Sequence, residues 1–136
     1  MKPPEEVRRE FVRQWILKAD EDLATARHLL ASAPTLLGPV GFHAQQAVEK
    51  YLNAYLVWRQ TEFPKTHNIA NLLDLVSSSQ EQLAISLDAA TVLTKYAVES
   101  RYPGDLPEIS FEEACEAVEL ARKSKKIVLT ALREAL

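Results

Sequence analysis

Apolar residues recur every three or four positions along most of the chain, which is the spacing of an amphipathic helix. Alternating stretches typical of strands are absent from the sequence, and it contains only three glycines. Short segments rich in proline, glycine or serine separate the periodic stretches. This pattern predicts an all-α fold, an antiparallel up-and-down bundle of four to five helices.

The first helix is expected to follow Pro3-Pro4 and to run to about residue 32. Its apolar stripe consists of Val12, Trp15, Ile16, Ala19, Leu23, Ala26 and Leu30. "APTLLGPVG" at 33–41 then breaks the helical pattern, because prolines and glycines continue a helix poorly. The second helix is expected over about residues 41–59, with Pro64 ending it.

Three further helices are expected in the second half of the chain. A short one over about residues 66–78 has Thr66 as its expected N-cap and an apolar face of Ile69, Leu72, Leu73 and Val76. The next is expected over about 80–100, with an inward face that includes Leu83, Leu87, Ala90, Leu93 and Ala97. Ser110 and Glu113 form the capping-box pattern of a last helix, which ends near residue 136.

The composition narrows the class of protein. A chain of 136 residues, about half of them apolar, has material for one compact core, so we expect a single domain over 1–136. The net charge of −3 argues against holding long nucleic acid by bulk electrostatics, which makes RNA a weaker partner candidate, although a local basic patch stays open. One cysteine, a charged N-terminus and no long apolar run indicate a cytoplasmic protein without a membrane segment.

The stretch "FHAQQAVEKYLNAYLVW" at 42–58 combines a wide apolar arc with a polar face. That face consists of His43, Gln46, Glu49, Lys50 and Asn53. Polar residues at this spacing are common on a solvent-facing helix, where Gln46 and Lys50 would form an ordinary surface pair. A helix with so wide an apolar arc is also expected at the centre of a bundle, where its polar face would meet a groove or a second subunit.

Four segments in this order and spacing resemble the HEPN-domain proteins: "KADEDLATARHLL", "FHAQQAVEKYLNAYL", "KTHNIANLLDL" and "YAVESRYPGD". The resemblance covers the chain from about residue 15 onwards. It implies a four- or five-helix antiparallel bundle that forms homodimers. It also implies either a nucleotide- or substrate-binding partner of a minimal nucleotidyltransferase, within a toxin–antitoxin type pair, or a metal-independent ribonuclease.

The ribonucleases of this family carry an arginine and a histidine separated by four to six residues, and that motif is missing here. Arg27 is followed directly by His28, and seven residues separate Arg59 from His67. Arg101 lies where the motif is expected, but no histidine follows it. We therefore expect no catalytic residues and a binding protein instead of an enzyme, while a composite site that uses His43 or His67 stays open.

The resemblance and the residue chemistry together indicate a nucleotide or phosphate site. Arg101 offers a planar fork for phosphate, Lys50 a second charge, and Tyr102 a ring that can stack on a base. Gln46 could read a base edge, and His67 is expected beside the free amides at a helix N-terminus. Each of these residues also has a structural alternative, as a cap, a loop anchor or a surface residue.

Other chemistries find little support in the sequence. The carboxylates do not form paired Glu-x-x-His motifs, and three scattered histidines with one cysteine do not form a zinc pattern, so we expect no metal and no cofactor. A phosphate-binding glycine loop is absent, and so is the signature of the nucleotidyltransferase itself. Three functions stay open: an accessory binding subunit, a divergent ribonuclease, and a homodimerisation module without a ligand.

Overall fold

The computed structural model describes residues 4–97 and 108–136, and it is an all-α bundle, as the sequence predicts. The described chain contains five α-helices and two 3₁₀ segments. In order, the elements are α1 (Glu5–Ser32), α2 (Leu37–Trp58), α3 (Ile69–Ser79), α4 (Glu81–Leu87), η1 (Asp88–Tyr96), α5 (Phe111–Ala131) and η2 (Arg133–Ala135).

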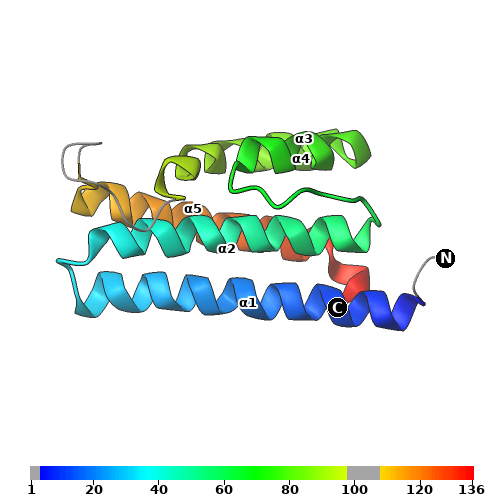
Figure 1. Ribbon diagram of the computed structural model, residues 1–136, viewed down its shortest axis with the longest axis horizontal. Coiled ribbons are helices and arrows are strands. Elements are labelled where there is room, and N and C mark those ends of the chain that lie inside the picture. The colour runs from blue at the N-terminus through cyan, green and yellow to red at the C-terminus, as the bar shows by residue number, and fades with distance from the viewer. Residues whose placement is uncertain (1–3, 98–107) are drawn as a thin grey trace.

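Helix α2 lies at the centre of the bundle. Helices α1 and α2 run side by side, α5 packs along both of them, and α3, α4 and η1 cover another side (Figure 1). The sequence explains this position, because apolar side chains occupy most of the circumference of α2 and are removed from water together. Its fully buried apolar residues are Val40, Ala44, Ala47, Val48, Tyr51, Leu52, Ala54 and Leu56.

The apolar stripe expected on α1 faces the core. Val12, Ala19, Leu23 and Ala26 are buried. Trp15, Ile16 and Leu30 are partly buried and pack against the same core. Burying a large apolar side chain stabilises a fold by about 1.5–3 kcal/mol, so this stripe holds α1 against α2 and α5.

The start of α2 differs from the sequence-based expectation, whereas its end lies within one residue of the expected position. The helix begins at Leu37, four residues early, because Pro39 lies in the first turn, where its missing N–H costs no hydrogen bond. It ends at Trp58, close to the expected end at about residue 59, but the turn that ends it comes before Pro64. Gln60 adopts a positive φ of 56°. The amides of Gln60 and Thr61 donate to the carbonyls of Val57 and Leu56, at 3.0 and 2.9 Å, which is a Schellman motif.

Gly41 allows a close approach at the start of α2. A Cβ at this position would lie 2.9 Å from the ring of Tyr96 and 3.1 Å from the Ile109 side chain. Real Cβ atoms do not tolerate the first distance, so a larger residue would force Tyr96 to move. Gly41 therefore lets η1 and the segment before α5 pack directly on α2.

The start of α3 corrects the expected cap. Thr66 is not the N-cap; Asn68 is, and its side-chain oxygen accepts a hydrogen bond from the Asn71 amide at 3.3 Å. Thr66 acts one step earlier, where its hydroxyl accepts from the Asn68 amide at 3.1 Å. The expected apolar face of α3 is confirmed, since its four residues are buried.

The expectation of a single α-helix over 80–100 is wrong. After Leu87 the chain tightens into the 3₁₀ segment η1, which ends at Tyr96, and residues 98–100 lie outside the described chain. A 3₁₀ helix brings residues three apart onto one face, and Ala90 and Leu93 are buried at this spacing. Thr94 on η1 accepts a hydrogen bond from the Ile69 amide at 3.1 Å, so η1 also caps α3.

Helix α5 starts where the sequence predicts and ends slightly early. The capping box is confirmed, because the Ser110 hydroxyl accepts from the Glu113 amide and the Glu113 carboxylate accepts from the Ser110 amide, each at 3.0 Å. The helix ends at Ala131 and η2 follows it. The C-terminus lies beside the first half of α1 (Figure 1), where Arg9 donates to the carbonyl of Glu134 at 2.5 Å.

Within the described chain, no helix is long and apolar enough to cross a membrane.

Candidate functional site

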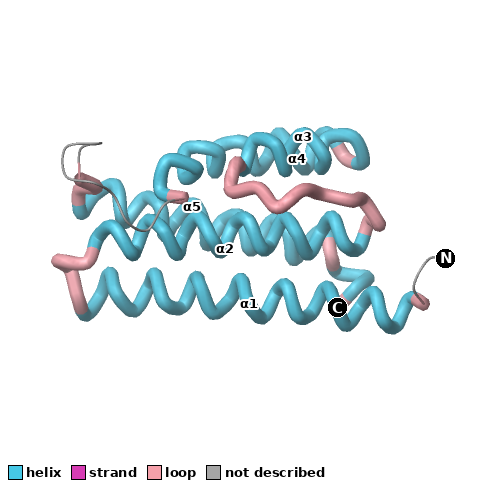
Figure 2. Tube along the Cα trace, in the orientation of Figure 1, coloured by secondary structure: helices cyan, strands magenta, loops and turns pink. Residues whose placement is uncertain are grey.

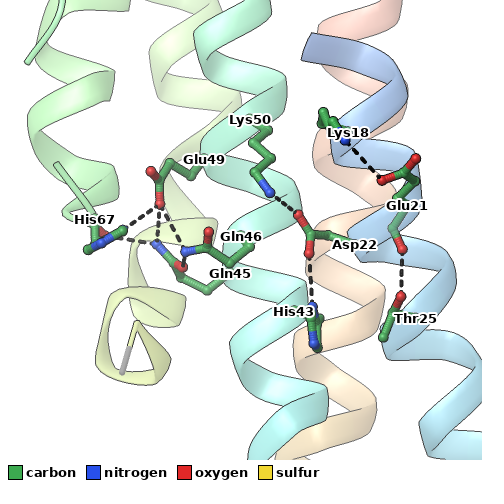
Figure 3. Close-up of polar contacts among 10 residues, drawn as sticks. All are labelled: Lys18, Glu21, Asp22, Thr25, His43, Gln45, Gln46, Glu49, Lys50 and His67. Atoms are coloured by element: carbon green, nitrogen blue, oxygen red, sulfur yellow. Dashed lines mark hydrogen bonds and ion pairs between the residues drawn. The ribbon is translucent and has the colours of Figure 1, made fainter. Parts of the chain in front are cut away.

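The polar face of α2 divides into two clusters, which together we call the α2 seam (Figure 3). The Asp22 cluster joins α1 to α2. Asp22 is buried on α1, and its two carboxylate oxygens accept hydrogen bonds from His43 Nδ1 at 2.8 Å and from Lys50 Nζ at 2.5 Å. A carboxylate bound by two donors is well compensated for its burial. These two hydrogen bonds from α2 therefore compensate the Asp22 carboxylate for the water that it loses on burial.

The Glu49 cluster joins α2 to the segment before α3. Glu49 Oε2 accepts hydrogen bonds from the side-chain amides of Gln45 and Gln46, each at 3.2 Å, and from His67 Nδ1 at 3.0 Å. Gln45 also donates to the His67 carbonyl at 2.9 Å. The chain after α2 turns back along that helix (Figure 2), which brings His67 beside residues that precede it by about twenty positions.

A third polar contact, next to the seam, ties three helices together. The hydroxyl of Tyr51 on α2 donates to Asp20 on α1 at 2.5 Å, and Lys125 on α5 lies 3.0 Å from the same carboxylate oxygen. Burial of the ring, reinforced by the hydrogen bond to Asp20, raises the pKa of Tyr51 well above its ordinary value. The phenol therefore stays protonated and serves as a permanent donor to Asp20.

Three of the five site residues expected from the sequence lie together on the seam. Gln46 and His67 share Glu49 as their acceptor, and Lys50 lies one turn further along α2. Arg101 and Tyr102 lie outside the described residues. The partners differ from those expected, because Lys50 pairs with Asp22 and not with Gln46. His67 contacts a carboxylate, and the first amide of α3 is already bonded to Thr94.

Two polar residues of α2, one in the seam and one outside it, are not accounted for by a helical-wheel projection of the helix. Gln45 is fully buried and holds the Glu49 cluster together, although the polar face expected from the sequence does not include it. The projection assigns Asn53 to the polar face, yet only 6% of it is exposed, and its side-chain oxygen is buried without a partner in the described chain. Both residues are buried by neighbouring helices whose positions a single-helix projection does not contain.

The chain matches the HEPN domain family over residues 12–131, which is nearly its whole length. It belongs to the HEPN family. Among solved structures, the HEPN chain is similar to TT1696 from Thermus thermophilus, with 30% sequence identity and a TM-score of 0.70. The similarity covers 92% of this chain and 98% of that one. No curated protein matches the sequence.

The histidines of this HEPN domain are held differently from one another. His43 and His67 each donate from Nδ1 to a carboxylate, which fixes the ring orientation and turns Nε2 away from that contact. His28 is exposed on α1. In the described part of the chain, no three His, Cys, Asp or Glu side chains gather in a way that could hold a metal ion. The arrangement can orient a ligand by hydrogen bonds.

Proposed function

We propose that this HEPN protein is a binding subunit, which presents a nucleotide or another substrate to a separate minimal nucleotidyltransferase. The pair would act as a toxin–antitoxin type unit, with the HEPN chain itself a homodimer. The observation that supports this proposal is the α2 seam, a polar face on a helix that is otherwise buried. Central bundle helices are normally apolar on every face that meets a neighbour, so a built polar face suggests recognition.

The seam has the properties of a preorganised recognition face. Gln46 and Lys50 are partly exposed, while their partners Glu49 and Asp22 have side chains only 12% and 11% exposed. These two largely buried carboxylates fix the directions of the outer donors, so a ligand would meet groups that are already oriented. Within the described contacts the Gln46 carbonyl oxygen makes no hydrogen bond, which suits the edge of a base.

The basic residues of the seam are each paired with a carboxylate, which limits their attraction for an anion. Asp22 opposes the charge of Lys50, and Glu49 lies against His67. The seam would therefore contribute directional hydrogen bonds to a base, a sugar or the transferase surface. In this proposal Arg101 supplies the phosphate-binding cation and Tyr102 the stacking ring.

A divergent ribonuclease is the second candidate, and the Asp22–His43 contact is the observation that favours it. A histidine oriented by a carboxylate through Nδ1 has its Nε2 positioned to move a proton. Against this, no arginine in the described chain forms a hydrogen bond with the side chain of His43 or His67. Cleavage of a generic RNA in excess chelator, lost on Arg101→Ala or His43→Ala, would establish this alternative.

The accessory-subunit proposal is tested by affinity capture of the tagged protein from its native cells, with mass spectrometry of what it retains. Three proteins are compared: the wild type, Lys50→Ala/Arg101→Ala, and the matched control Arg59→Ala/Lys123→Ala. Each double variant removes one arginine and one lysine. Arg59 and Lys123 are exposed and lie outside the seam.

We expect the wild type and the control to retain a nucleotidyltransferase and the seam variant to retain roughly tenfold less of it, a loss of about 1.4 kcal/mol in binding. Recovery of the wild-type protein alone, as a dimer without transferase or nucleotide, would refute the proposal. Such a result would favour the homodimerisation module.

A further inference from the structure

A second polar region lies in a groove between α1 and α5 and shares no residue with the α2 seam. This α1/α5 groove has a volume of about 530 Å³ and is open to solvent. Its lining residues are Leu23, Arg27, Arg122, Lys125, Lys126, Leu129, Thr130 and Arg133. Five of these eight residues are cationic and none is acidic, although the chain as a whole has a net charge of −3.

The groove carries more positive charge than its neighbours neutralise. Arg122 pairs with Glu119 at 2.6 Å, and Lys125 pairs with Asp20 at 3.0 Å. Arg27, Lys126 and Arg133 form no ion pair with any residue in 4–97 or 108–136. Three cations are therefore concentrated in one groove without a carboxylate in the described chain to balance them.

Ordinary structural reasons do not account for this concentration. The stretch Arg122-Lys123-Ser124-Lys125-Lys126 crowds like charges on α5, and like charges four positions apart destabilise a helix. The attraction of cations to a helix C-terminus is confined to the last turn, and the last turn of α5 contains no basic residue. A surface that serves only solubility intersperses both signs.

The chemistry of the lining specifies the ligand. Arginine forks bind phosphate through two hydrogen bonds, lysine adds a compact charge, and the groove offers both. Arg122, Lys126 and Thr130 follow one another at intervals of about 6 Å along the helix, so they can contact successive groups of an extended anion. Leu23 and Leu129 supply an apolar floor on which a sugar or a base can rest.

We infer that the α1/α5 groove binds a ligand with several consecutive phosphate groups. Two sources share this chemistry, a nucleoside triphosphate and a short single strand of RNA. The inference does not rest on partnership with a nucleotidyltransferase, because the groove and the α2 seam share no residue. Loss of transferase capture by the seam variant would leave the groove's ligand binding unchanged.

The test is a binding titration of the full chain with three probes, inorganic triphosphate, ATP and a short single-stranded RNA, at about 150 mM salt. The wild type is compared with Arg27→Ala/Lys126→Ala and with the matched control Arg59→Ala/Lys123→Ala. Lys123 neighbours the groove in sequence but does not line it. All four positions are exposed, so the variants are expected to fold, which far-ultraviolet circular dichroism checks.

We expect saturable binding of at least one probe, weakened roughly tenfold or more in the groove variant and less than about twofold in the control. Binding of triphosphate and ATP alike assigns the groove to nucleotides, and binding of RNA alone assigns it to an RNA strand. Either result supports a phosphate-chain ligand. The inference is overturned if no probe binds, or if the control loses as much affinity as the groove variant.

Discussion

The α2 seam and the α1/α5 groove use charged residues in opposite ways. In the seam both carboxylates have donors around them: Asp22 accepts from His43 and Lys50, and Glu49 accepts from two glutamines and His67. In the groove the cations outnumber their partners, since two of five are paired with described residues. The charges of the seam are balanced within it, whereas the groove is electrostatically incomplete.

The difference separates charges that build the bundle from charges that await a ligand. Removing one member of a buried, paired set leaves the other member unpaired, which destabilises the folded state. Removing an exposed cation that has like-charged neighbours leaves no such deficit. Stability should therefore respond strongly to changes in the seam and weakly to changes in the groove, while phosphate binding should respond in the reverse order.

The largest loss of stability is expected for Asp22→Ala. The change leaves His43 and Lys50 without their acceptor on α1, so the free energy of unfolding should fall by about 2–3 kcal/mol. Urea unfolding followed by circular dichroism measures it. Asp22→Asn, which keeps the shape but removes the charge, should lose less. A loss below about 0.5 kcal/mol for Asp22→Ala, the level of an ordinary surface substitution, would mean that the cluster is not structural.

A smaller effect is expected for Tyr51→Phe, which removes the donor to Asp20 and should cost about 1–2 kcal/mol at neutral pH. The pKa of Tyr51 is raised in the folded state, so its stabilising contribution is fully present below the unfolded value of about 10 and is lost as the pH rises above it. The difference between wild type and variant should thus shrink above about pH 10. Unfolding curves at neutral and alkaline pH test this, and a constant difference would contradict it.

The smallest effect on stability is expected for Arg27→Ala/Lys126→Ala. These side chains are exposed and have no ion-pair partner in the described chain, so the free energy of unfolding should change by less than about 0.5 kcal/mol. Low salt should, if anything, favour the variant, because repulsion inside the groove is then unscreened. Thermal melts at low and moderate salt provide the measurement. A loss above about 1 kcal/mol would show that the groove is a structural element.

The parts of the fold that the sequence predicts are those governed by local patterns. The apolar stripe of α1 and the Ser110–Glu113 capping box depend only on neighbours a few positions away, and both are confirmed. The 3₁₀ conformation of η1 does not follow from the sequence, because Ala90 and Leu93 also fit the spacing of an α-helix. The segment packs against α2, α3 and α5, and the local pattern does not contain these contacts.

The candidate sites depend even more on contacts between helices, which the local sequence pattern does not contain. The residue types of the seam are identifiable from one helix, but the pairing of Lys50 with Asp22 depends on how α1 and α2 align. The groove combines Arg27 with Lys126, which lie far apart in sequence and on different helices. The run Arg122–Lys126 is a visible signal in the sequence, and the negative net charge of the whole chain masks it.

Calorimetric titration of three single variants tests the comparison most directly, with whichever of inorganic triphosphate, ATP and the short RNA the wild type binds most tightly. Lys126→Ala changes the groove, Lys50→Ala the seam, and Lys123→Ala neither, while each removes one lysine. We predict that Lys126→Ala weakens binding roughly three- to tenfold and that the other two stay within about twofold of the wild type. If Lys50→Ala weakens binding as much as Lys126→Ala, or Lys126→Ala matches Lys123→Ala, the assignment of phosphate binding to the groove is wrong.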